Sequence, residues 1–247
     1  MMAWLSPVIW PFLRTLAVFT SAPVFSSKAF PVRARIALAF FIALAAQPAL
    51  GQQPVISMTS PGAIGAVMQQ VGVGLAIGFA IRLVFAAVEL AGEVVGFQMG
   101  LSFASFFDPS FNTQSSAVAR FFGQMAIFMF IVMNGHFLVL MTVINSFKSF
   151  PVDQNFLTAV KQMKVLNLGA DLFASGLWMA LPMVGMLMFA NLALGIVSRV
   201  APQMNIYAIG FPITLTVGLV GMATTLPMLD QPFLALMTRA IDIFAAI

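Results

Sequence analysis

The chain has no cysteine, a single histidine and few charged residues among its 247 amino acids. Without cysteine it forms neither a disulfide nor a thiolate metal site, and one histidine argues against a protein-bound transition metal. Charged residues make up 7% of the chain, against about 25% in a typical soluble domain. Hydrophobic residues make up 61%, and the mean hydropathy is +1.03. These values exclude a soluble globular or disordered chain, so this one must lie in lipid or be covered by other apolar subunits.

Stretches without any charge mark the candidate helices. They cover residues 15–27, 36–50, 54–81, 94–107, 121–147, 172–198 and 200–229. Most of them supply, alone or with a neighbour, the roughly 20 residues that a helix needs to cross hydrocarbon. Helices are the default in lipid because backbone polar groups must be satisfied internally, and the apolar runs are too continuous for an outer-membrane barrel. The sequence therefore predicts an all-α fold of several hydrophobic, membrane-associated helices.

Prolines and one short stretch predict interruptions in these helices. Pro182, Pro212 and Pro227 lie inside long apolar runs and should kink or end helices there. The stretch 94–107 is too short to cross a membrane and is followed by Asp108-Pro109, a helix-stop signal, so we expect it to be re-entrant or buried in protein. We expect one domain over residues 1–247, with an internal break at 148–164, where lysines accumulate.

The positive charge predicts an orientation rather than a nucleic-acid site. The net charge of +4 comes from 11 basic residues spread thinly along the chain. If the N-terminus lies outside, most of them fall in the connectors on the inner side, at 28–35, 82–93 and 148–164 and in the C-terminal tail. This bias is typical of a bacterial inner-membrane protein.

Small residues recur every fourth position between Gly72 and Gly100. Gly74 and Gly78 form one such pair, Ala76 and Ala80 another, and Gly92, Gly96 and Gly100 a double repeat. Such faces let two helix backbones approach closely, so we expect tight helix packing within the chain or with a partner. A phosphate-binding loop is not supported because no strand precedes the glycines.

Three charged residues lie close to one line on the same helix. Arg82, Glu89 and Glu93 are separated by seven and four residues, and Gly100 falls on that line too. In an apolar chain such charges form a structural ion pair at a helix seam, which we favour, or a proton or cation relay. The relay would require ionisable groups on facing helices, and Asp171 is the only other acid deep in a long run.

The segment from Leu101 to Ala119 interleaves phenylalanines with small and hydroxyl residues around Asp108-Pro109. Two interpretations are equally consistent with these residues: a surface loop whose aromatic rings reach the lipid headgroups, or an apolar constriction that seals an aqueous pore. Elsewhere no Ser/His/Asp set, pair of catalytic carboxylates or nucleotide motif stands out, so the sequence predicts neither an enzyme nor a cofactor site.

Several motifs together resemble those of a known family. They are the block Gly92-Glu93-Val94-Val95-Gly96-Phe97-Gln98-Met99-Gly100-Leu101-Ser102-Phe103-Ala104 with Asp108-Pro109, then Asn134-Gly135-His136, then Asn191-Leu192-Ala193-Leu194-Gly195 with Arg199 and Ala201-Pro202-Gln203, and Gly210-Phe211-Pro212. In this order they resemble the FliR family of flagellar biosynthetic proteins. Met99 stands where the related subunit of virulence-type secretion systems has arginine, which favours the flagellar branch.

The resemblance implies a non-enzymatic subunit of the type III protein export gate in the bacterial inner membrane, at the flagellar basal body. It implies FliP and FliQ as partners, FlhB and FlhA as further ones, and unfolded flagellar proteins as cargo. The family's plug loop corresponds here to Phe106, Phe107, Asp108, Pro109, Ser110, Phe111, Asn112, Thr113, Gln114, Ser115 and Ser116, which favours the constriction over the surface loop. The rival hypothesis is a small-solute or ion-coupled transporter that uses the relay above, but the sequence has no convincing inverted repeat.

Overall fold

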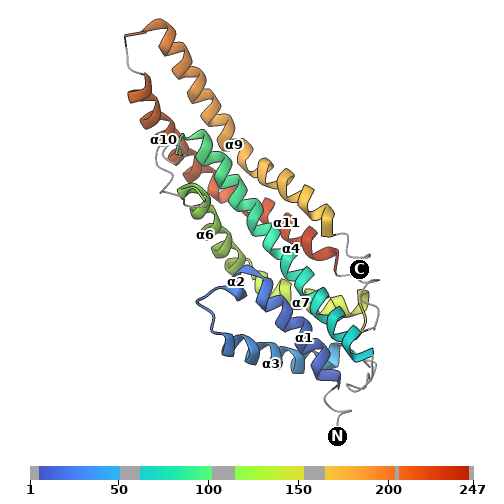
Figure 1. Ribbon diagram of the computed structural model, residues 1–247. Coiled ribbons are helices and arrows are strands. Elements are labelled where there is room, and N and C mark those ends of the chain that lie inside the picture. Colours follow the sequence, from blue (N-terminus) through green and yellow to red (C-terminus); the bar gives the residue numbers. More distant parts are fainter. Residues whose placement is uncertain (1–5, 51–61, 102–114, 153–164, 204–205, 245–247) are drawn as a thin grey trace. The chain divides into compact units, whose positions relative to one another are not determined.

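The computed structural model describes residues 6–50, 62–101, 115–152, 165–203 and 206–244. All the regular elements in these ranges are helices (Figure 1). They are α1 (Ser6–Ser21), α2 (Pro23–Ser26), α3 (Val32–Leu50), α4 (Gly62–Gln98), α6 (Ala117–Val132), α7 (Gly135–Ser149), α9 (Val165–Val200), α10 (Ile206–Thr225), the 3-10 helix η3 (Leu226–Met228) and α11 (Asp230–Asp242). The prediction of an all-α fold is confirmed.

Within the described ranges, four helices are long and apolar enough to cross a membrane. They cover Val32–Leu50, Gly62–Gln98, Leu168–Val200 and Ala208–Met228, and α6 with α7 would be a fifth if that bent pair is one span. The prediction of a protein with hydrophobic membrane helices is therefore also confirmed.

Helix α4 is longer than the charge-free stretches indicated. It includes Arg82, Glu89 and Glu93 and ends only at Gln98. We expected the stretch 94–107 to be re-entrant or buried in protein; its residues 94–98 form the end of α4, and residues 102–107 lie outside the described part of the chain. The physical reason is that a charged residue ends a run of apolar residues but does not end a helix, since arginine and glutamate are good helix formers.

The three prolines differ in whether a helix ends at them. Pro182 and Pro212 do not end α9 and α10, which continue past them, whereas Pro227 lies in η3, where α10 has ended. A proline inside a helix removes one backbone hydrogen bond. In an apolar surrounding, water does not compete for the remaining bonds, so the helix persists.

The charge-free run 121–147 is divided by a bend of 70° between α6 and α7. Asn134 takes the left-handed conformation there, with a φ of 56°, and asparagine is among the few residues that tolerate it. The ring and carbonyl of Phe130 leave no room for a Cβ at Gly135. Asn134-Gly135 therefore forms the corner because both residues fit where other side chains would be strained.

The chain forms two compact units that several of the helices connect. Unit 1 comprises Met1–Val84, Phe130–Ala170 and Met237–Ile247, and unit 2 comprises Phe85–Met129 and Asp171–Leu236. The break that we expected at 148–164 falls within unit 1, and its residues 153–164 lie outside the described ranges.

In unit 1, the first half of α4 packs closely against α1. A Cβ at Gly74 would lie 2.5 Å from the carbonyl oxygen of Arg14 and 2.6 Å from the Cβ of Ala17. A Cβ at Gly78 would overlap the side chain of Ser21. The glycines therefore lie where two helix backbones meet, and Trp10, Val18 and Phe19 of α1 are fully buried.

Candidate functional site

The second half of α4 meets the start of α6 in unit 2 through two of the predicted packing glycines. A Cβ at Gly92 would lie 2.8 Å from the Cα of Ala119 and 2.9 Å from the Cβ of Phe122, and one at Gly96 would lie 2.8 Å from the Oγ of Ser116. Gly123 of α6 lies equally close to α4, because a Cβ there would lie 2.9 Å from the Oε1 of Glu89. The α4–α6 junction is thus built on glycines from both helices.

Replacing Gly92 with alanine is expected to destabilise this junction. The nearest atom to the new Cβ belongs to the α6 backbone, which cannot rotate away as a side chain can, so we expect a loss of about 1–3 kcal/mol of stability. Gly185→Ala is the matched control, because nothing lies within 4 Å of a Cβ at that position in α9. There the helix propensity of alanine should stabilise the protein by up to about 1 kcal/mol. Thermal unfolding of the two purified variants checks this, and equal midpoints would contradict the packing role.

Glu93 fixes the N-terminus of α6 from the neighbouring helix. Its Oε2 accepts a hydrogen bond from the backbone N–H of Ser116 at 3.0 Å. The Oγ of Ser116 in turn accepts one from the N–H of Ala119 at 3.1 Å, as the N-cap residue of a helix does. A capping box takes its carboxylate from the third residue of the same helix. Here that residue is alanine, and α4 supplies the carboxylate, which also suits the positive end of the helix dipole.

Gly100 ends α4 rather than extending its packing face. It has a positive φ of 79°. The N–H of Gly100 donates to the carbonyl of Phe97 at 3.0 Å, and the N–H of Leu101 donates to the carbonyl of Gly96 at 3.1 Å. These two bonds and the left-handed glycine between them form a Schellman motif, which glycine favours because it has no Cβ.

Helix α10 holds the same end of α4. The Oγ1 of Thr214 donates to the carbonyl of Met99 at 3.3 Å. A Cβ at Gly218 would lie 2.5 Å from the Cγ of Met99, and Met99 is fully buried. The chain therefore leaves α4 at a position fixed by both its backbone and a neighbouring helix.

The described chain stops at Leu101 and resumes at Ser115, and both sides of this gap lie next to Gly96. Leu101 is hydrogen-bonded to the carbonyl of Gly96, and Ser116 lies against its Cα. Of the predicted plug residues, only Ser115 and Ser116 are described, and Phe106, Phe107, Asp108, Pro109, Ser110, Phe111, Asn112, Thr113 and Gln114 lie outside the described residues. The described residues on the two sides of the gap, Leu101 and Ser116, thus both lie at Gly96.

The remaining members of the predicted charged line lie on α4 with different surroundings. Arg82 is exposed and belongs to unit 1, whereas Glu89 and Glu93 belong to unit 2. Glu89 lies against Gly123 of α6, and Glu93 caps the same helix. The two carboxylates therefore both face the N-terminal half of α6.

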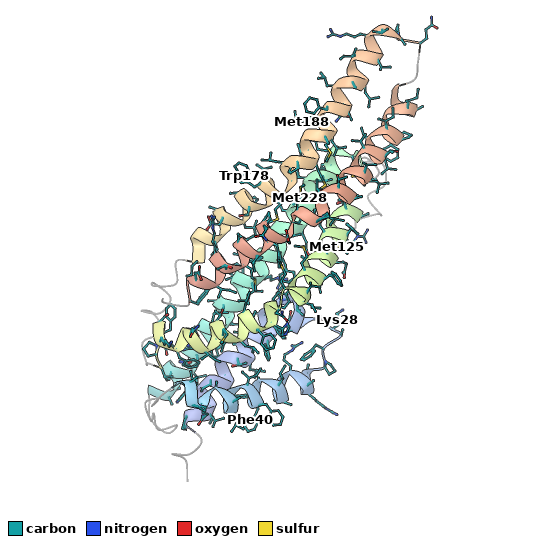
Figure 2. The ribbon with its side chains drawn as sticks, turned by 180° about the vertical axis from the view of Figure 1, so that it is seen from behind. Lys28, Phe40, Met125, Trp178, Met188 and Met228 are labelled. Atoms are coloured by element: carbon teal, nitrogen blue, oxygen red, sulfur yellow. The ribbon has the colours of Figure 1, made fainter. Side chains whose placement is uncertain are left out.

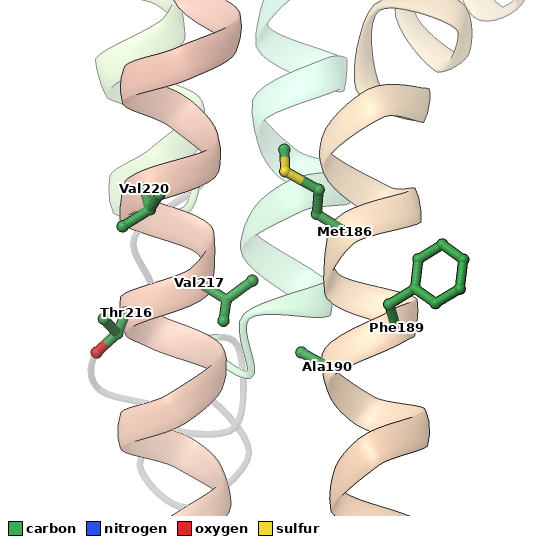
Figure 3. A pocket seen from close by; sticks show the side chains of 6 residues that line it. All are labelled: Met186, Phe189, Ala190, Thr216, Val217 and Val220. Carbon is green, nitrogen blue, oxygen red and sulfur yellow. The ribbon is translucent and has the colours of Figure 1, made fainter.

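Described residues of unit 2 line two apolar hollows. One, of about 390 Å³, is lined by Met99, Leu101, Ala117, Val118, Phe121, Leu215, Leu219, Met222, Ala223 and Leu226. The other, of about 420 Å³, lies between α9 and α10. In Figure 3, Met186 and Val217 point toward each other across it, while Phe189 points away from α10. These linings offer van der Waals contact rather than acid–base chemistry, so they suit apolar groups of lipid or protein.

Unit 1 contains a buried charge that links three parts of the chain. Arg14 of α1 is 0% exposed. Its guanidinium donates to the Oε1 of Gln70 in α4 and to the Oγ of Ser146 in α7, both at 2.9 Å, and to the carbonyl of Phe150 at 2.7 Å. It also lies 3.6 Å from the centroid of the Phe147 ring. Burial lowers the pKa of Arg14 to about 9, so the group stays charged at neutral pH.

The partners of Arg14 suit a cation although none of these acceptors is a carboxylate. Ser149 ends α7 and Phe150 is its C-cap residue, so the guanidinium lies at the negative end of the helix dipole. The face of an aromatic ring attracts cations as well. Arg14 was not among the site residues predicted from the sequence. The signal was available, since a single charge inside a long apolar run marks a specific site by default.

Comparison with known proteins then places the chain in a family. The family model of the bacterial export proteins, family 1, matches residues 5–240. The chain belongs to this family. The chain is 38% identical to the flagellar biosynthetic protein FliR of Escherichia coli (strain K12) over 94% of its length and 88% of that protein. It is 37% identical to FliR of Pectobacterium carotovorum, over 100% of its length and 94% of that protein, and 31% identical to FliR of Bacillus subtilis (strain 168), over 85% and 82%. The resemblance of this export-family chain to FliR is confirmed.

Proposed function

We propose that the chain is a subunit of the flagellar protein export apparatus, and that it forms with FliP and FliQ the channel for unfolded flagellar proteins. The observation that carries this proposal is membership of the bacterial export family over residues 5–240, together with the flagellar relatives that match most of the chain. The apparatus would lie in the bacterial inner membrane at the basal body, with FlhB and FlhA as further partners.

The exposed apolar surface of unit 2 supports a role within a larger assembly. On α9, Trp178 is 73% exposed, Phe189 75% and Val200 79%. Continuous apolar faces of this kind are covered by lipid or by other subunits. Partner helices in the channel would cover part of this surface, including the groove between α9 and α10.

The plug is part of the proposal. Residues 106–116 would close the channel with the apolar bulk of Phe106, Phe107 and Phe111. Support comes from the described residues on the two sides of the segment, because Leu101 is hydrogen-bonded to Gly96, Ser116 lies against Gly96, and Glu93 caps α6. A segment that opens and closes a channel needs helix ends that stay in place, since otherwise α4 and α6 would move whenever the phenylalanines are displaced.

The proposed role requires no chemistry from this chain. Apolar walls exclude water and ions around an extended polypeptide, and the energy for movement comes from other components of the apparatus. The chain would therefore act as a non-enzymatic structural subunit.

Deleting the gene in a flagellated host is expected to abolish secretion of rod and hook proteins, because the channel would lack one of the subunits that form it. Secreted flagellar proteins in the culture medium are measured, with the wild-type gene on a plasmid as the control. Purification of the tagged chain from the complemented strain should co-purify FliP and FliQ. Normal filaments in the deletion strain would contradict the export role. If the plasmid restores secretion but the purified chain carries neither FliP nor FliQ, the channel assignment is wrong.

A further inference from the structure

Helix α3 buries only a narrow stripe of small residues. Ala39, Ala43 and Ala46 are its buried residues. Large apolar side chains elsewhere on its surface are exposed, including Phe40 at 45%, Phe41 at 66% and Leu44 at 46%. Phe40 extends from the outer side of the helix in Figure 2. A helix with this distribution presents a broad apolar face that acyl chains can cover.

A group of basic residues, here called the basic cluster, lies at the N-terminal end of α3. It consists of Lys28, Arg33 and Arg35. Lys28 and Arg33 are exposed, and Lys28 lies at the α2–α3 connection in Figure 2. Arg35 is half-buried, and one terminal nitrogen reaches the carbonyl of Phe30 only at 3.4 Å. Its Nε is buried and has no acceptor among the described residues. Arg35 therefore has hydrogen-bonding capacity that this part of the chain does not use.

The sequence around the basic cluster supplies no negative charge. No acidic residue precedes Glu89 in the chain, and the first turn of α3 contains none. The N-terminus of a helix adds a partial positive charge of its own. Three cations thus lie within residues 28–35, beside the positive end of a helix and with no acidic residue before Glu89, and an anion from outside the chain would complement them.

We propose that the basic cluster binds the phosphate of an anionic phospholipid whose acyl chains lie along the exposed face of α3. The basic cluster matches the phosphate of such a molecule and the apolar face of α3 matches its acyl chains. A soluble anion would contact only the basic cluster and would leave the apolar face uncovered. The length of α3 also fits: 19 residues at 1.5 Å each extend for about 28 Å, close to the thickness of the hydrocarbon core. The headgroup would lie at one end of α3 with the acyl chains beside it. This inference uses unit 1 alone and does not depend on the proposed export role.

Lipid retention by the purified full-length assembly tests the site. The assembly is equilibrated in nanodiscs of equimolar phosphatidylglycerol and phosphatidylcholine and then washed in detergent, and the retained lipids are measured by mass spectrometry. The wild type should retain phosphatidylglycerol in excess. Arg33→Gln with Arg35→Gln should lower the ratio of the two lipids by about fivefold for each charge removed, which corresponds to ~1 kcal/mol per basic residue. Arg199→Gln with Arg239→Gln, which removes two exposed charges elsewhere, should leave the ratio unchanged.

Two further measurements on the wild type avoid dependence on the folding of the variants. Added salt should reduce the excess of phosphatidylglycerol, because exposed charges are screened. Excess inorganic phosphate at constant ionic strength should not displace the lipid. The proposal is overturned if the wild type shows no excess of phosphatidylglycerol, if the control pair reduces it as much as the α3 pair does, or if inorganic phosphate displaces the lipid.

Discussion

Replacing Arg14 with methionine is expected to reduce the yield of folded protein severely. Methionine fills much of the same space but leaves Gln70, Ser146 and the carbonyl of Phe150 without their donor in the interior of unit 1. Each unsatisfied buried acceptor costs about 1–3 kcal/mol. The sum is a large share of the total stability of a typical protein. The yield and the unfolding midpoint of the detergent-purified assembly measure the effect.

Two further variants separate the contributions at Arg14. Arg14→Lys keeps the charge but loses the planar fork that serves three acceptors at once, so its stability should fall between the wild type and the methionine variant. Arg199→Met is the matched control, because Arg199 is exposed at the end of α9, and its effect should stay within about 0.5 kcal/mol. If Arg14→Met and Arg199→Met are equally stable, Arg14 does not hold unit 1 together.

Deleting residues 106–114 is expected to make the inner membrane leak small ions and solutes while the assembly still forms. The deletion removes three phenylalanines of the proposed plug but keeps Ser116 and Glu93, so α6 retains its cap. Displacing a buried phenylalanine costs about 1.5–3 kcal/mol, and without these contacts nothing would oppose the passage of water. Conductance of the purified assembly in planar bilayers and solute uptake by cells measure the leak.

A variant of unchanged length distinguishes apolar bulk from loop length. Replacing Phe106, Phe107 and Phe111 with serine keeps the loop and the residues on either side of it but removes the seal, so it should also leak. Arg199→Gln is the control, since it changes an exposed residue of α9 and leaves all three phenylalanines and Glu93 in place, so it should not leak. Normal assembly of the deletion variant with the conductance of the parent would assign the segment to an interfacial loop instead.

The sequence by itself determined the class of the protein. A 7% share of charged residues with long apolar runs leaves helices in lipid or among apolar subunits as the only consistent fold. The motif around Gly92 and the blocks near Asn134 and Asn191 were enough to indicate the family, because they depend on local residue order. The helix boundaries were less predictable. Charges at Glu89 and Glu93 divided the hydropathy of α4 without dividing the helix.

Only the tertiary structure decided what individual residues do. Gly92, Gly96 and Gly100 look equivalent in the sequence, yet the first two admit α6 and the third ends α4, because the backbone turns left-handed at Gly100. Glu93 meets Ser116 across 23 residues, and Arg14 meets Ser146 across 132. Spacing along one helix predicts which residues share a face, but it carries no information about what another helix brings to that face. The packing of α1, α4 and α7 makes Arg14 a buried link rather than an isolated charge in an apolar run.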